Sequence, residues 1–588
     1  MAALPQYSYI FGVGMVFAFL DAWNIGANDV ANAFATSVSS RSLTMPQAMG
    51  IAVVMEFTGA VLAGQVARVA GTIRNDIIDV DAFVDAPSVL MLAMLCALIG
   101  SSLFLTLATK IGLPVSTTHC IIGGIIGVGF ATVGANGVDW SWEGVSQVFA
   151  AWGIAPCVAG CFGALLFLFT KYFVLRASDP LKRGMITVPF YFALTSGILT
   201  MLIVWKGAAS LDLDDWGTAP TVGTTFGVAG GVGLIATFFL LPYIYVRLVK
   251  EDWTLKQWEV VKGPLLLRRP PPPPRPEDAM LVPDYYAGHK TREELEREGP
   301  AQTTSTEVTS DEESLRNKEI GNEKAPGPAT TTTATSAIKP ILPQTPSARA
   351  ISRPKGSWTS PLHWIRIINW AFWRGVSVDV VTAQTGTNEV KFIQKLLVGK
   401  GLEDKHARVK HYDPKVEHLF SFLQVMTAAT ASFAHGANDV ANAMGPMSAI
   451  FSIWDTGVVQ DDSPVPIWVL VYGGAAISIG CWTYGYNLIR NLGNRITLHS
   501  PCRGFCMELG AALTVVFATR LALPVSTTQC IIGATVGVGL CAGDLKAINW
   551  RMVAWAYSGW FITLPSTALI SGLLMAFVVN APQFGNAV

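Results

Sequence analysis

Long apolar segments constrain the fold of this chain more than any other feature. A run of roughly 20 mostly apolar residues can cross the hydrocarbon core of a membrane as one helix. Hydrophobic residues make up 51% of the chain and charged residues 14%, against roughly 25% charge in a typical soluble protein. The sequence therefore predicts an all-α polytopic membrane protein with about 12 transmembrane helices. The predicted spans are residues 8–27, 47–66, 88–108, 115–134, 147–170, 187–205, 224–246, 419–443, 465–488, 505–519, 525–543 and 552–579.

A hydrophilic insertion divides these spans into two groups. We expect residues 1–246 to form an N-terminal membrane half, residues 247–415 the insertion, and residues 416–588 a C-terminal membrane half. The insertion is rich in Pro, Thr and charged residues and buries too little apolar surface to fold alone, so we expect it to be largely disordered, at about residues 265–355. Residues 358–375 combine Trp, Ile, Phe and Arg, a pattern that fits an amphipathic helix on the membrane surface or a short helix packed on the cytoplasmic face.

The distribution of charge predicts orientation and excludes some functions. Lys and Arg gather in one set of alternate short loops, for example at Arg41, Lys182 and Arg490, whereas the other set is richer in Asp. By the positive-inside rule the insertion is cytoplasmic and both termini are extracellular. The net charge is +0, and without a concentrated basic region nucleic-acid binding is not expected.

Two motifs occur twice, in the same register. The octet Gly26–Ala33 recurs residue for residue as Gly436–Ala443, a shift of 410 positions, and Leu113–Thr118 recurs as Leu523–Thr528 with the same shift. The two octets follow or end the first and the eighth predicted spans, and successive spans alternate in direction, so a shift of seven spans makes the copies run in opposite directions. The sequence thus predicts an inverted repeat, an arrangement common in secondary transporters, whose substrates bind near the midplane between repeats.

The octets contain ligands for a small cation. Asp29 and Asp439 lie in apolar segments, where an unpaired carboxylate is costly. Carboxylate and amide oxygens suit a hard cation, and we expect Gly26 and Gly436 to let the helices unwind so that backbone carbonyls join the site. The alternative interpretation is that these polar groups only join helices through hydrogen bonds. The predicted sodium ligands are Asp29, Asn32, Asp439, Asn442, Asn28 and Asn438.

The second motif contains groups that suit an anion. Pro114 and Pro524 interrupt a helix, and the Ser-Thr-Thr that follows places hydroxyls beside the free N–H groups of a new helix start. A helix start with free donors binds anions. Segment 115–134 is therefore expected to be a broken or re-entrant helix. The predicted phosphate-binding residues are Ser116, Thr117, Thr118, Ser526, Thr527, Thr528, Asn28 and Asn438.

Together these features resemble the inorganic phosphate transporter family, particularly its fungal sodium-coupled plasma-membrane members. The resemblance rests on the paired octets, the paired Pro-Val-Ser-Thr-Thr segments, the large loop after the seventh span, and Glu56 and Glu508 in apolar segments. It implies sodium-driven import of inorganic phosphate through the plasma membrane by alternating access, with Na⁺ as coupling ion, no other cofactor and a homodimer. It also favours a role for Glu56 and Glu508 in transport coupling.

Three other readings share some of these features. A proton-coupled phosphate carrier, or a carrier of another oxyanion, would contain the same motifs, and a transporter that also acts as a nutrient sensor would use the insertion for signalling. A hydrolase using Ser116 and His119 is disfavoured because the second copy has Gln529 where the first has His119, so we do not expect an enzyme. Lys110 and Arg520, four residues before each proline, are read as interfacial anchors. Cations bound by the aspartates are therefore expected to neutralise the phosphate.

Overall fold

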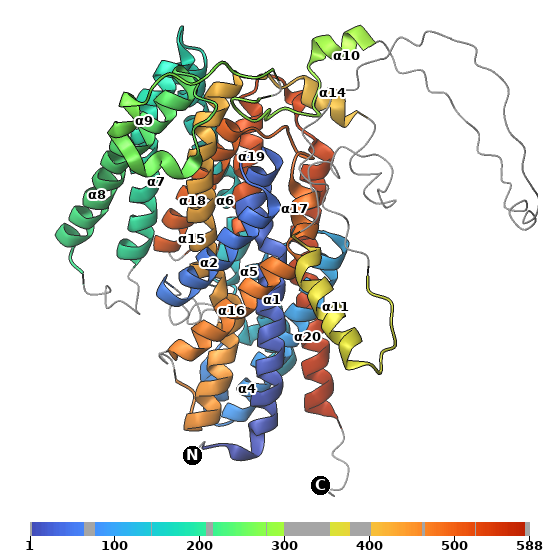
Figure 1. Cartoon of the computed structure of the whole chain (residues 1–588). Coiled ribbons are helices and arrows are strands. Elements are labelled where there is room, and N and C mark those ends of the chain that lie inside the picture. The colour runs from blue at the N-terminus through green and yellow to red at the C-terminus, as the bar shows by residue number, and fades with distance from the viewer. Residues whose placement is uncertain are drawn as a thin grey trace, which may run out of the picture.

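The computed structural model is a bundle of long helices (Figure 1). It describes residues 3–63, 77–142, 144–206, 216–277, 279–298, 353–376, 401–460, 465–521, 523 and 525–581. Within these ranges the secondary structure is helical, apart from one isolated bridge between Ile78 and Val138. Nine of the described helical segments are long and apolar enough to cross a membrane. The protein is thus a multi-pass membrane protein, as the composition predicts.

The first half of the bundle comprises α1 (Ser8–Ser39), α2 (Met45–Ala63), α4 (Pro87–Ile111), α5 (Thr117–Thr132), α6 (Val145–Thr170), α7 (Pro180–Lys206), α8 (Thr218–Ile235) and α9 (Leu241–Ile244). The second half comprises α15 (Pro414–Thr456), α16 (Ile467–Tyr484), α17 (Tyr486–Leu492), α18 (Pro501–Arg520), α19 (Thr527–Leu540) and α20 (Trp550–Asn580). Three short helices lie between the halves: α10 (Arg292–Glu298), α11 (Pro361–Arg374) and α14 (Leu402–Ala407). Both chain termini lie at one end of the bundle, here named the terminus side, and α10 and α14 lie at the opposite end, the loop side (Figure 1).

Two pairs of helices form hairpins that enter the bundle and return to the same end. The first pair is α4 with α5, and the second pair is α18 with α19. Helices α5 and α19 have 16 and 14 residues, about 24 and 21 Å at 1.5 Å per residue, which is shorter than a hydrocarbon core of about 30 Å. Ile78, before α4, pairs with Val138, after α5. Likewise the Asn549 backbone N–H, after α19, donates to the Ile496 carbonyl, before α18 (2.8 Å). The sequence predicted a span followed by a broken or re-entrant helix for the first pair and two spans for the second. Because each pair starts and ends at the same end of the bundle, the direction of the later helices is the same as if both members crossed.

Matching contacts link the two halves. Helix α5 packs against α20 and α19 against α6, while α1 packs against α16 and α15 against α2. Small residues permit these contacts: a Cβ atom on Gly127 would lie 2.0 Å from the Ala568 carbonyl oxygen, and one on Gly537 would lie 2.2 Å from that of Gly160. These two glycines are repeat equivalents, so the same close approach occurs twice.

Part of the insertion packs on the loop side of the bundle. We name Tyr285–His289 the strap. The Tyr286 hydroxyl donates to Glu417 (2.6 Å), and the Ala287 carbonyl accepts from Arg41 (3.0 Å). These contacts lie within the stretch 265–355 that was expected to be disordered, and two buried tyrosines supply the anchoring that composition alone does not reveal. The disorder expected for the rest of the insertion lies largely outside the described residues.

Helix α11 is amphipathic and lies beside the bundle (Figure 1). The Trp482 indole of α16 donates to the Phe372 carbonyl (2.9 Å), so one end of α11 is attached to the bundle. Leu362, Ile365 and Ile368 remain exposed. An apolar face of this kind suits contact with lipid, which combines the two placements considered for residues 358–375.

We predict that acid releases the strap. The Nδ1 atoms of His289 and His406 lie 3.2 Å apart, and burial lowers the pKa of His289 to about 3 and that of His406 to about 4. Both stay neutral while the strap is bound but take up protons near their ordinary pKa of about 6.5 once it is released. Binding is therefore at full strength above pH about 6.5 and weakens as the pH falls towards 4, by up to ~1.4 kcal/mol per pH unit per histidine.

Hydrogen exchange of the strap amides measured at pH 7.5 and 5.5 checks this prediction. We expect faster exchange at pH 5.5, after correction for the intrinsic effect of pH, and a smaller change in His406→Gln. Equal protection of the strap at both pH values would contradict it.

Candidate functional site

The two octets lie on unbroken helices at the centre of the bundle. Helices α1 and α15 continue through Gly26–Ala33 and Gly436–Ala443 without a change in helical backbone. The expectation that Gly26 and Gly436 allow unwinding was therefore wrong. These glycines allow close packing instead: a Cβ on Gly26 would lie 2.0 Å from the Ile477 carbonyl oxygen, and one on Gly436 would lie 2.3 Å from that of Glu56.

The chain is broken at the second motif instead, as expected for the first copy. Helix α4 ends at Ile111 and is capped by Gly112, whose φ of 76° few other residues adopt. Helix α5 begins at Thr117 after the extended residue Ser116. The Ser116 side chain accepts a hydrogen bond from the His119 backbone N–H (3.2 Å) and so caps α5. Ser526 precedes α19 in the same extended conformation, without a side-chain capping bond. Both hairpin tips therefore present a helix start inside the bundle.

Each octet contacts the hairpin tip of the opposite half. The Asn32 amide donates to the hydroxyls of Thr527 (3.3 Å) and Thr528 (2.8 Å). Asn442, the repeat equivalent of Asn32, donates in the same way to Thr117 (3.3 Å) and Thr118 (3.2 Å). This crossed pairing places all four threonine hydroxyls and both helix starts around the octets.

The octet carboxylates join the same cluster. Asp29 accepts hydrogen bonds from Thr117 (3.0 Å) and from Thr528 (3.1 Å), so it contacts both hairpin tips. Asp439 accepts from Thr527 (3.4 Å). Both carboxylates are buried. Both aspartates and three of the four threonines that were predicted as ligands thus lie in one buried cluster.

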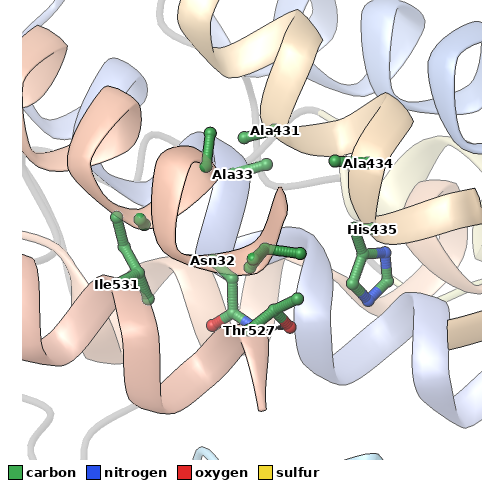
Figure 2. A pocket seen from close by; sticks show the side chains of 10 residues that line it. Asn32, Ala33, Ala431, Ala434, His435, Thr527 and Ile531 are labelled. Atoms are coloured by element: carbon green, nitrogen blue, oxygen red, sulfur yellow. Dashed lines mark hydrogen bonds between the residues drawn. The ribbon is translucent and has the colours of Figure 1, made fainter. Parts of the chain in front are cut away.

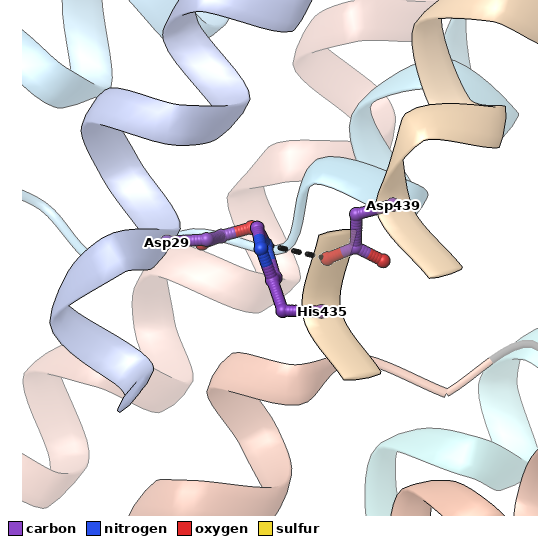
Figure 3. Close-up of side chains that lie close together, drawn as sticks. All are labelled: Asp29, His435 and Asp439. Atoms are coloured by element: carbon purple, nitrogen blue, oxygen red, sulfur yellow. Dashed lines mark ion pairs between the residues drawn. The ribbon is translucent and has the colours of Figure 1, made fainter. Parts of the chain in front are cut away.

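A histidine lies between the two aspartates (Figure 3). His435 Nε2 lies 2.9 Å from Asp439 and 3.5 Å from Asp29, and its Nδ1 lies 2.6 Å from Glu56. Ligand atoms of Asp29, His435 and Asp439 lie within 4.8 Å of one another, close enough to contact one ion. His435 precedes the second octet where Ile25 precedes the first, and it was not among the predicted site residues. Its spacing of four residues from Asp439 on one helix was the available signal.

The two remaining predicted asparagines, Asn28 and Asn438, make their described hydrogen bonds within their own half of the chain rather than to the opposite hairpin tip. Asn28 holds the first hairpin tip, because its amide donates to the Leu113 carbonyl (3.2 Å) and accepts from the Val115 N–H (3.3 Å). Asn438 donates to the adjacent Asp439 (3.5 Å). Lys110 is exposed, whereas the site is buried; the side chain of Arg520 lies outside the described residues.

The two predicted coupling glutamates lie in different surroundings. Glu56 is in the central cluster, where it also accepts a hydrogen bond from Ser432 (2.9 Å). Glu508 belongs to a separate buried group, where it accepts from Ser37 (2.7 Å), Thr427 (2.5 Å), Gln424 (3.2 Å) and Thr36. Of these two glutamates, Glu56 contacts His435, the residue before the second octet. Glu508 instead contacts Thr36 and Ser37, which follow the first octet on α1.

A small cavity adjoins the site (Figure 2). Asn32, His435 and Thr527 form its polar wall, and the rest is lined by Ala33, Ala431, Ala434, Ala511, Ala512, Val515 and Ile531. Since α15 and α18 start at the loop side, Ala431 and Ala511 lie on the loop side of the polar cluster. The cavity therefore extends from the polar cluster towards the loop side.

A comparison with known families identifies the family of this chain. A sequence model of the Phosphate transporter family matches residues 25–571, which include both octets and both hairpin tips. The chain belongs to the phosphate transporter family. It is thus a transporter and not an enzyme, and the family-level expectation from the motifs is confirmed.

Individual relatives of this phosphate transporter align with nearly the whole chain. "Phosphate-repressible phosphate permease pho-4" of Neurospora crassa is 48% identical, with 99% of each protein aligned. "Sodium-dependent phosphate transporter 1" of Mus musculus is 28% identical over 98% of this chain and 96% of the relative. A solved structure described as "The sodium-dependent phosphate transporter" has a TM-score of 0.57 and 24% identity, covering 98% of this chain and 100% of its own, and supports the fold.

Proposed function

We propose that this phosphate transporter is a sodium-coupled symporter that imports inorganic phosphate across the plasma membrane by alternating access. The crossed pairing of Asn32 and Asn442 with the opposite hairpin tips carries the proposal, because it brings groups suited to a cation and groups suited to an anion into one buried cluster. Relatives named as sodium-dependent support sodium as the coupling ion. The insertion faces the cytoplasm, both termini face outside, the halves form an inverted repeat, and the working assembly is a homodimer.

The ligand roles follow from the chemistry of each group. Asp29, Asn32, Asp439 and Asn442 hold sodium ions, with Asn28 and Asn438 supporting them through their amide oxygens. Helix starts with free N–H groups orient the phosphate oxygens, together with the amides of Asn28 and Asn438 and the hydroxyls of Ser116, Thr117, Thr118, Ser526, Thr527 and Thr528. Glu56 and Glu508 are assigned to coupling.

Electrostatics explains why sodium must accompany phosphate. When ionised, Asp29, Asp439 and Glu56 carry three negative charges around His435, which supplies at most one positive charge. A phosphate anion is repelled by this site until cations bind, and repulsion is strong where water is scarce. Each ligand then raises the affinity for the other, which is the thermodynamic basis of coupling.

The driving force is sufficient for concentrative uptake. If two sodium ions enter with one dihydrogen phosphate, each tenfold sodium gradient supplies ~1.4 kcal/mol per ion. A membrane potential of about 100 mV adds ~2.3 kcal/mol for the one net charge. The sum of ~5 kcal/mol supports a phosphate gradient of a few thousandfold.

Proton coupling is the second candidate. It is favoured by the position of His435, a titratable side chain in contact with three carboxylates. A proton bound at this cluster would reduce the same repulsion that sodium reduces.

Uptake of radiolabelled phosphate with sodium replaced by choline tests the proposal. We expect uptake to fall at least tenfold in choline at both pH 5.5 and pH 7.5, and excess unlabelled phosphate, but not sulfate, to compete. Full uptake in choline at pH 5.5 would overturn sodium coupling in favour of protons, and competition by sulfate would overturn the assignment of phosphate as the preferred oxyanion.

A further inference from the structure

A second buried polar cluster lies on the terminus side of the site. We name Asp21, Asn24, Ser101 and Ser102 the terminus-side cluster; the first two are on α1 and the others on α4, and all four are buried. Asp21 precedes Asp29 by eight residues on one continuous helix, which places it about 12 Å along the helix axis. The cluster is thus separate from the central site but on the same helix.

Several oxygen atoms of this cluster have no hydrogen-bond partner. They are Asp21 Oδ2, Asn24 Oδ1 and Ser101 Oγ. The Ser102 hydroxyl donates to the Phe17 carbonyl (3.1 Å) and lies 3.4 Å from Asp21 Oδ1, while the Ser101 hydroxyl is close enough to the same carboxylate to interact with it, without an ideal hydrogen-bond geometry. The Asn24 amide donates to Leu20 (2.9 Å) and Thr106 (2.9 Å), which leaves its oxygen as a free acceptor.

The second half of the chain shows that the fold does not need these polar groups. A shift of 410 positions relates Asp21, Asn24, Ser101 and Ser102 to Ala431, Ala434, Ala511 and Ala512. All four alanines line the cavity beside the central site. The same layer of the repeat is therefore an apolar cavity in one half and a cluster of unpaired oxygens in the other, and the polar side chains call for a role other than packing.

The charge of Asp21 needs compensation. No lysine, arginine or histidine forms an ion pair with it in the described part of the chain, and an isolated buried carboxylate is costly. A proton on the carboxyl would add one donor, which can satisfy one free acceptor. A small cation can contact the carboxylate, amide and hydroxyl oxygens together, and these are the hard ligands that such ions prefer.

We propose that Asp21, Asn24 and Ser101 bind a monovalent cation of the sodium type, in addition to the cations held at Asp29 and Asp439. The inference rests on the proposed function for the role of this ion: it would occupy the site nearer the extracellular side and be met first by incoming sodium. Binding of the ion by these three residues does not depend on the proposed function; only the role of the ion in transport does. The second half has alanines in its place, so the repeat supplies one such site and not two.

Binding of ²²Na⁺ to the purified full-length protein without phosphate tests the site directly. We expect Asp29→Asn/Asp439→Asn protein to retain one bound sodium ion and to lose it when Asp21→Asn is added. Ser101→Ala removes the hydroxyl beside the Asp21 carboxylate and should raise the sodium Kd at this site at least threefold. Asp455→Asn, which removes an exposed carboxylate of α15, should change nothing.

The experiment distinguishes a sodium ion bound at Asp21 from a proton on the Asp21 carboxyl. Asparagine imitates a neutral aspartic acid, so equal sodium stoichiometry with and without Asp21→Asn would overturn the proposal. The fourfold change of Asp21, Asn24, Ser101 and Ser102 to alanine reproduces the packing of the second half and guards against misfolding: if this variant folds and still binds the ion, the proposal also fails. Sodium-independent phosphate uptake by wild type, together with loss of the ion in Asp21→Asn, would refute only the proposed function.

Discussion

Replacement of Asp29 or Asp439 by asparagine is expected to abolish sodium-stimulated phosphate uptake, with a loss of at least about tenfold. Each carboxylate accepts hydrogen bonds from a threonine at a hairpin tip and lies within reach of His435. Asparagine keeps the size of the side chain but removes the charge that holds a cation, so phosphate loses its counterion.

The measurement is initial uptake of radiolabelled phosphate in sodium and in choline, normalised to protein at the cell surface. Asp455→Asn is the matched control, because this exposed residue lies on the same helix as Asp439; its uptake should equal that of wild type. Full sodium stimulation in both Asp29→Asn and Asp439→Asn would refute the charge scheme.

The second large effect is expected from Gly436→Ala. A Cβ at this position would lie 2.3 Å from the Glu56 carbonyl oxygen, far inside van der Waals contact. Because α2 and α15 must then separate, the substitution displaces Glu56 from His435, and overpacking alone costs about 1–3 kcal/mol. We expect uptake to fall below a tenth of wild type and the unfolding temperature in detergent to drop by several degrees.

Gly12→Ala provides the comparison, since a Cβ on Gly12 has no atom within 4 Å. Removing a helical glycine at an open position should leave stability equal or slightly higher. If Gly436→Ala behaved like Gly12→Ala in both assays, the close packing of α2 on α15 would not be a requirement of the site.

The sequence predicted which repeat residues occupy equivalent places better than it predicted how they contact one another. The shift of 410 positions identified Asn32 with Asn442 and Thr117 with Thr527, and these pairs do occupy equivalent places in the structure. It could not predict that each amide contacts the opposite hairpin tip, because that depends on how two distant helices cross.

Residues without a repeat equivalent were the hardest to interpret. His435 corresponds to Ile25, and Glu56 to Pro466, so the repeat gave no reason to pair them, although they lie 2.6 Å apart. The prediction that Gly26 and Gly436 allow the helices to unwind was wrong for a related reason. A glycine in a helix can permit either unwinding or close packing. Only the positions of Ile477 and Glu56 in the structure show that these two permit close packing.

A high-resolution map of the protein with sodium and phosphate bound is the most direct test of the central claim. We expect bound phosphate at the starts of α5 and α19, and monovalent cations bound to the oxygens of Asp29 and Asp439. Phosphate bound elsewhere, for example beside Lys110, with no cation at either aspartate, would contradict it.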